Sequence, residues 1–218
     1  MIKKFLVRVE EILGKNKVKN SKEGNKTMWY IVKNISVQET VAVERCRRAI
    51  PYAVTDKIFS PSYECKRRYL GEWHTKVKSF FPGYVFIQSE NKDKLERYLE
   101  RIPDIVTPVM IGGAFNPIGD DERIFLGELF DSDYCISCSL GYIVDDQLIV
   151  EKGPLMGKEK YIKKIDRHRR IANIWMSFME QEKQIEVGLE VPARLTAEEY
   201  QEMKKENATS SRHIEMGA

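Results

Sequence analysis

The spacing of hydrophobic positions changes along the chain and divides it into parts of different character. Residues 29–32 (Trp-Tyr-Ile-Val) are an aromatic and β-branched run, which predicts a buried strand. Over residues 42–50, apolar side chains recur three or four positions apart, as on one face of a helix. We expect this helix to open with a capping box at Ser36-Val37-Gln38-Glu39, in which hydroxyl and carboxylate each satisfy a free backbone donor.

Between residues 56 and 129 the pattern mixes strands and helices. A strand at 57–59 leads to a long hairpin with Gly71 at its tip and with Lys76 and Lys78 on the returning strand. Further elements are expected as an aromatic strand at 80–87, a helix at 95–102, a strand at 106–111 and a helix at 120–129. This order predicts an α+β fold in which helices cover an antiparallel sheet.

The later part of the chain contains only strand-like alternation. Short runs at 148–150, 172–178 and 185–191 alternate apolar and polar residues, which predicts a small β-barrel. The last residues are charged, and Thr196-Ala197-Glu198-Glu199 is expected to cap one short helix. We therefore predict an extension at 1–27 that begins with an amphipathic helix, a first domain at 28–131, a linker at 132–141, a barrel at 142–192 and a tail at 193–218.

Composition narrows the function. The net charge is only +3, and no run of about 18 apolar residues exists, so we expect a cytoplasmic protein without membrane contact. Cys135-Ile-Ser-Cys138 has ligand-like spacing, but no second ligand pair accompanies it, so we expect neither metal nor cofactor. A thiol enzyme remains the alternative. It requires a lowered thiol pKa, which Asp131 and Asp133 oppose, and we predict no catalytic residue.

The most informative chemistry is a basic segment around a Gly-Pro turn at Gly153-Pro154. Residues 151–170 contain eight Lys and Arg against three acids, a surplus that suits phosphate neutralisation. Tyr161 and His168 add rings on which a base can stack. The alternative is a solvated hairpin whose charges keep a small barrel soluble. The predicted RNA-binding residues are Lys152, Lys158, Lys160, Lys163, Lys164, Arg167, His168, Arg169 and Arg170.

These residues carry a resemblance to a known family. The Gly-Pro-x-x-Gly core at 153–157, followed by Ile162-Lys163-Lys164-Ile165-Asp166, resembles the KOW motif of the NusG family of transcription elongation factors. Residues 29–32 and Phe81-Pro82-Gly83-Tyr84-Val85-Phe86 resemble the first domain of the same family. One departure is Lys160, where the family often has Gly. The resemblance implies a NusG-type sheet domain joined to an SH3-like KOW barrel.

The resemblance also implies partners. The first domain would bind RNA polymerase through an apolar depression, for which the candidates are Tyr30, Phe81, Pro82 and Tyr84. The run at 165–170 and the tail are most similar to the LoaP group of antitermination paralogues, which implies binding of a nascent RNA hairpin and read-through of terminators. The alternative is a general elongation factor whose barrel binds Rho or a ribosomal protein. Non-template DNA is a further candidate partner, for Lys33, Arg45, Arg48, Arg67 and Arg68, and we expect a monomer.

Overall fold

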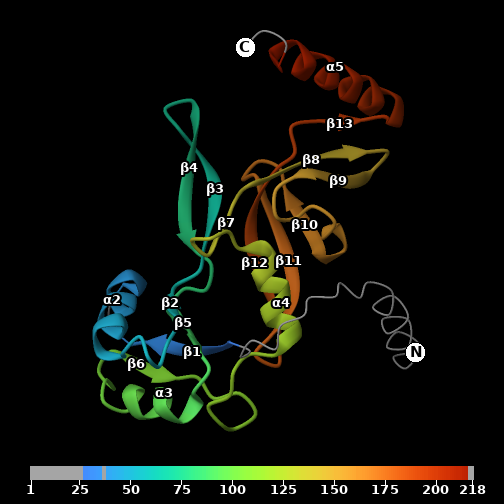
Figure 1. Cartoon of the computed structure of the whole chain (residues 1–218). Helices are drawn as coiled ribbons and strands as arrows, with labels where there is room; N and C mark the ends of the chain where they lie inside the picture. The colour runs from blue at the N-terminus through green and yellow to red at the C-terminus, as the bar shows by residue number, and fades with distance from the viewer. Residues whose placement is uncertain (1–26, 36–37, 216–218) are drawn as a thin grey trace, which may run out of the picture.

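The computed structural model describes residues 27–35 and 38–215, with side chains described as far as Asn207 (Figure 1). Four strands form the N-terminal sheet in the order β2-β5-β1-β6. They are β1 (Met28–Asn34), β2 (Lys57–Phe59), β5 (Tyr84–Ser89) and β6 (Val106–Pro108). The helices of this part are α2 (Glu39–Ala49), α3 (Lys92–Leu99) and α4 (Asp120–Leu129). The predicted α+β class is confirmed.

The N-terminal sheet is buried on both faces, which explains the unbroken apolar run at 29–32. Successive strand residues point to opposite faces. Tyr30 and Val32 pack with the buried stripe of α2 and with α3, whereas Trp29 and Ile31 belong to a second core. That second core continues into the C-terminal part of the chain, where it includes residues such as Phe178. The two parts therefore share hydrophobic packing.

A long hairpin rises from the N-terminal part and lies beside the C-terminal sheet (Figure 1). It consists of β3 (Ser62–Tyr69) and β4 (Glu72–Ser79), joined at Leu70 and Gly71, which both have positive φ as a tight hairpin turn requires. The segment 132–141, predicted as a linker, is not irregular throughout. It contains β7 (Cys135–Ile136), which pairs with β3, and the start of β8. Strand pairing thus ties this segment to the hairpin.

The C-terminal part is a curled β half-barrel with strand order β10-β11-β12-β8-β13 and with β9 paired to β8. Its strands are β8 (Ser139–Val144), β9 (Gln147–Lys152), β10 (Ile162–Asp166), β11 (Ile171–Phe178), β12 (Gln181–Glu190) and β13 (Arg194–Leu195). A short 3-10 helix, η1 (Glu159–Tyr161), precedes β10. The three alternating runs predicted from the sequence correspond to β9, β11 and β12.

The starts of two helices bear on the two capping boxes predicted from the sequence. Thr196 and Glu199 form the predicted capping box, with N–H···O distances of 2.7 and 3.2 Å, and α5 (Ala197–Glu215) is longer than the short helix expected. At α2 the Glu39 carboxylate accepts a hydrogen bond from the Gly83 N–H (2.7 Å), so it fixes the Pro-Gly turn. Ser36, Val37 and the extension at 1–26 lie outside the described residues.

Candidate functional site

The loop between β9 and β10 is held by hydrogen bonds from its backbone N–H groups to the side chains of Ser139 and Glu159. Gly153 has φ +97°, and a Cβ at this position would approach the Ser139 Oγ to 2.6 Å, so only glycine fits. The same Ser139 Oγ accepts a hydrogen bond from the N–H of Leu155, which is buried. The Glu159 carboxylate accepts from the Gly157 N–H at 3.4 Å. The loop therefore has a defined shape, from which β10 begins.

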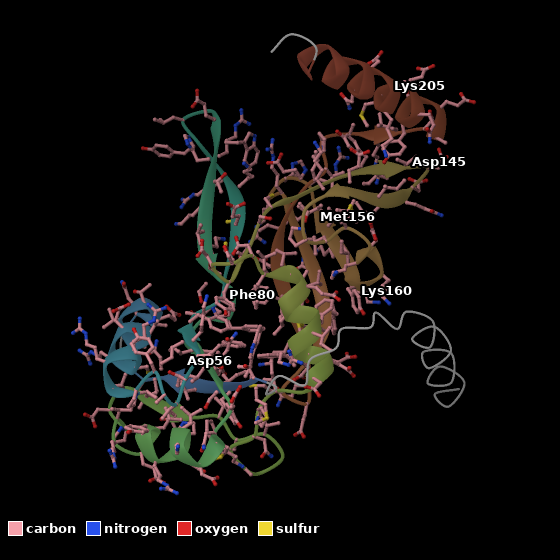
Figure 2. All side chains as sticks on the ribbon, in the orientation of Figure 1. Asp56, Phe80, Asp145, Met156, Lys160 and Lys205 are labelled. Carbon is pink, nitrogen blue, oxygen red and sulfur yellow. The ribbon has the colours of Figure 1, made fainter. Side chains whose placement is uncertain are left out.

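The nine predicted RNA-binding residues do not form one cluster. Lys158 is held in an ion pair with Glu128 of α4 (3.0 Å), and Lys160 lies over the Tyr161 ring. Figure 2 shows Lys160 on the side of the C-terminal sheet away from the β3–β4 hairpin. Lys152 ends β9. Apart from these three lysines, six of the nine predicted residues remain for a common surface, and all six lie between positions 163 and 170.

Those six residues follow β10 and the turn after it. A register shift between Ile162 and Lys164 interrupts the pairing of β10 with β11, and both Lys163 and Lys164 are exposed. The four residues from Arg167 to Arg170 form the turn into β11. The structure thus brings together Lys163, Lys164, Arg167, His168, Arg169 and Arg170 at one edge of the sheet.

A groove separates this turn from the β3–β4 hairpin; we call it the basic groove. It consists of two adjoining cavities of about 590 and 320 Å³, both lined by Arg68, Trp73 and His168. The first also includes Arg167 and Arg170, and the second includes Lys76, Lys78 and Arg169. These volumes are in the range of ligand sites, about 300–1,000 Å³. Cations from two distant segments of the sequence therefore face one cavity system.

Ion pairs hold some of these cations and leave others uncommitted. Arg169 makes a bidentate pair with Glu186 (3.0 and 3.2 Å). Arg170 pairs with Glu190 (2.9 Å), and its guanidinium lies 3.8 Å from the centre of the Trp73 ring. Arginine over an indole is a strong cation–π arrangement, so it fixes both side chains. The turn is therefore preorganised.

The hairpin side of the groove was not among the predicted RNA-binding residues. The sequence showed Lys76 and Lys78 two positions apart on one strand, and it showed Arg68 as a candidate for DNA contact. Nothing in the local pattern indicated that this hairpin lies against the turn at 167–170. The sequence signal that could have found this wall is Trp73, a large aromatic residue that belongs to none of the sites predicted from the sequence. In the structure every residue of β4 except Ser79 is exposed.

The predicted polymerase-binding residues are distributed over both faces of the N-terminal sheet. Tyr30 is fully buried on the helix-covered face, with its ring 5.0 Å from that of Phe115. Phe81 is also buried, and its ring stacks on Phe178 of the C-terminal part at 4.2 Å between centroids. Pro82 is exposed and Tyr84 half-buried. Phe81 is thus covered by the second half of the same chain.

Cys135 and Cys138 have raised thiol pKa values, whereas an active-site thiol needs a lowered one. Burial raises the pKa of Cys138 to about 11, and burial likewise raises the pKa of Cys135. A nucleophilic or redox-active cysteine needs a lowered pKa, because the thiolate is the reactive form. Glu64 accepts a hydrogen bond from the Cys138 N–H (3.0 Å), so this segment ties β3 to β8. Its geometry is that of a structural junction.

The remaining predictions concern DNA contact, metal binding and membrane insertion. The candidate DNA-contacting residues Lys33, Arg45 and Arg48 are exposed on β1 and α2 and remain predictions. Among the described residues, no group of three or more His, Cys, Asp or Glu is arranged to hold a metal ion. None of the described helices is both long and apolar enough to cross a membrane.

Comparison with known proteins finds a family match for the N-terminal part. Residues 27–125 match the NusG family model, described as "Transcription termination factor nusG", so this part of the chain is similar to that family. Among solved structures, one described as "Domain interaction in Thermotoga maritima NusG" is similar, with 21% identity, a TM-score of 0.44 and coverage of 76% of this chain and 94% of that one. The family match ends within α4, before the C-terminal strands.

Proposed function

We propose that this chain, which matches the NusG family model over residues 27–125, is a transcription antitermination factor of the LoaP kind. Its N-terminal part binds RNA polymerase, and its C-terminal part binds nascent RNA. The observation that carries the RNA half is the shared edge of Lys163, Lys164 and the turn at 167–170. Each cation that meets a phosphate releases a counterion, so a few exposed cations on a rigid turn give useful affinity.

The polymerase half is supported by the family match and by the aromatic strand. The turn before β5 is fixed by the hydrogen bond from Gly83 to Glu39, which presents Pro82 to solvent. Tyr84 lies half-buried beside it. Binding of this kind needs no catalytic group, because it favours one state of the polymerase over another through differential affinity.

The covered position of Phe81 suggests an order of events. While Phe178 stacks on Phe81, that ring is not available to a partner, and docking through it requires the two parts of the chain to separate. The basic edge is open in the same arrangement. RNA therefore binds first and recruits the protein, and polymerase docks afterwards.

Charge reversal on β10 tests the RNA half. Lys163→Glu and Lys164→Glu place two acids at the exposed edge, and we expect affinity for a labelled RNA stem–loop to fall roughly 10- to 100-fold at about 50 mM salt. Polymerase binding, measured by co-elution with the purified enzyme, is expected to stay unchanged. The matched control reverses Lys94 and Arg97, which are exposed on α3.

Transcription tests the whole proposal. A purified polymerase transcribes a template that carries a leader hairpin followed by terminators, with and without the protein. We expect read-through to increase with the wild type and not with the β10 variant. Polymerase binding without RNA binding, together with recovery of Rho or a ribosomal protein in a pull-down, would instead identify a general elongation factor.

A further inference from the structure

The β3–β4 hairpin exposes more apolar surface than a solvated hairpin needs. Tyr69, Leu70, Trp73 and Val77 are 63%, 85%, 37% and 57% exposed, although all four lie within one hairpin. Trp73 and Val77 lie on the same face of the hairpin, as the strand register shows, and exposed apolar side chains that share a face mark an interaction surface. Because cations surround them on both strands, the partner must combine apolar faces with negative charge.

The hairpin is held at a fixed place beside the C-terminal sheet. Gly188 of β12 lies so close to β3 that a Cβ would collide with the Glu64 carbonyl oxygen. On the other side, β7 pairs in parallel with the first residues of β3. An isolated two-stranded hairpin is marginally stable in water, so these contacts give the hairpin its rigidity. The width of the basic groove is therefore built into the fold.

The charges in the groove are only partly neutralised. Among the described residues, none forms an ion pair with Lys76, Lys78 or Arg167. The one acid that lines the groove is Glu190, and it already contacts Arg170 at 2.9 Å and Lys66 at 3.9 Å. A free surplus of positive charge therefore faces the cavity from both walls.

We propose that the basic groove is a single composite site for unpaired RNA, such as the loop of a transcript hairpin. Lys76, Lys78 and Arg167 contact successive phosphates, and a base stacks on the part of Trp73 that Arg170 leaves exposed. The inference rests on the proposed function, because it assumes that the turn at 167–170 binds RNA. It adds that the N-terminal hairpin supplies the second half of that site.

The chemistry of the groove favours unpaired RNA over a duplex. Stacking on an aromatic side chain requires a base face that is not already stacked on its neighbours. The Arg170 guanidinium lies 3.8 Å from the centre of the Trp73 ring, nearer than the cation in any other cation–π pair of the described residues, and the two rigid planes form a platform. Duplex RNA would present phosphates to the cations but no face to the indole.

Binding of an oligo(U) RNA of about twelve nucleotides, within the usual range of roughly 4–16 per site, tests the composite site in the full chain. Trp73→Ala is expected to lower its affinity roughly 5- to 150-fold, the equivalent of one lost stacked base. The matched control is Trp175→Ala, because Trp175 is 40% exposed on β11 and lies outside the groove. It is expected to bind like the wild type.

The charges are tested separately. Lys76→Glu with Lys78→Glu is expected to lower affinity roughly 10- to 100-fold at about 50 mM salt and to flatten its salt dependence. The control is again reversal of Lys94 and Arg97 on α3. All these substitutions are at exposed positions except that of half-covered Trp73, and circular dichroism melting curves check that each variant is folded.

The outcomes separate this inference from the proposed function. If the β10 variant loses RNA and both hairpin variants bind like the wild type, the composite site is wrong and the proposed function stands. If the wild type retains the RNA stem–loop and not oligo(U), the composite site is again wrong and the proposed function stands; if it retains neither RNA, both are wrong. Equal affinity for oligo(dT) of the same length, or for a blunt RNA duplex, would overturn the assignment to unpaired RNA.

Discussion

The packing of the N-terminal part against the C-terminal part has opposite effects on two surfaces of this molecule, one apolar and one basic. The apolar surface around Phe81 is covered, because Phe178 stacks on it at 4.2 Å. The basic groove is created, because the same packing sets the β3–β4 hairpin opposite the turn at 167–170. Association of the two parts hides one surface and completes the other.

This difference links the two proposed binding events. A ligand shifts a conformational equilibrium only by its differential affinity for the two states. RNA in the groove favours the associated arrangement, whereas polymerase at Phe81 favours separation. Bound RNA therefore recruits the protein by raising its concentration near the transcript and not by uncovering Phe81. RNA contacts on β10 persist in both states, because Lys163 and Lys164 belong to the C-terminal part alone. We therefore expect RNA to bind more tightly before docking than after it.

The largest effect is expected at the centre of the shared core. Phe178 is fully buried, so Phe178→Ala should lower the free energy of unfolding by about 3–5 kcal/mol, from lost burial and the cavity left behind. Trp175→Ala, on the same strand but 40% exposed, should cost about 1 kcal/mol or less. Urea denaturation checks both. Equal, small losses would show that the two parts do not share a core in solution.

The alkylation rate of Cys138 reports the same packing of the two parts, because the Cys138 N–H is hydrogen-bonded to Glu64 of β3. Burial raises the pKa of Cys138 to about 11 from an ordinary 9.0, so at pH 8 its alkylation should be roughly 100-fold slower than that of an unperturbed thiol. Cys46, whose pKa burial also raises to about 11, is the internal control, because it lies inside the N-terminal part. Phe178→Ala should speed alkylation of Cys138 and leave Cys46 slow, as followed by mass spectrometry. Acceleration of both would indicate general unfolding.

The smallest effect concerns Arg169, whose charge is neutralised by Glu186 in the folded protein. Glu186→Gln releases Arg169 from its bidentate pair, and we expect the affinity for oligo(U) to rise roughly three- to tenfold at about 50 mM salt. Glu128→Gln is the comparison, because it releases Lys158 outside the groove. An increase with Glu128→Gln and not with Glu186→Gln would place the RNA over the loop at 153–157 instead.

The sequence predicted the elements well because they follow local patterns. The alternation at 172–178 and 185–191 and the capping box at Thr196 each depend on residues close together in the chain. Tertiary contacts add roles that no local pattern shows. The Glu39 carboxylate, for example, accepts a hydrogen bond from the Gly83 N–H of a distant turn.

The site was predicted only in part, for the same reason. The cations at 163–170 are adjacent in sequence, so a simple count found them. The second wall of the groove comes from residues about a hundred positions earlier. Its approach depends on Gly188, a residue that no strand pattern marks as important. A site assembled from two distant segments is not visible in the periodicity of either one.

Gly188 also offers the most direct test of the central claim, that one packing arrangement hides Phe81 and completes the groove. A Cβ there collides with the Glu64 backbone, so Gly188→Val should disfavour association by about 1–3 kcal/mol, whereas Gly127→Val places its Cβ in open space. The measurement is the affinity of each variant for oligo(U) and for RNA polymerase. We predict that Gly188→Val binds the RNA more weakly and polymerase more tightly than the wild type, with Gly127→Val unchanged. Two affinities that fall together, or that both stay unchanged, would contradict the account.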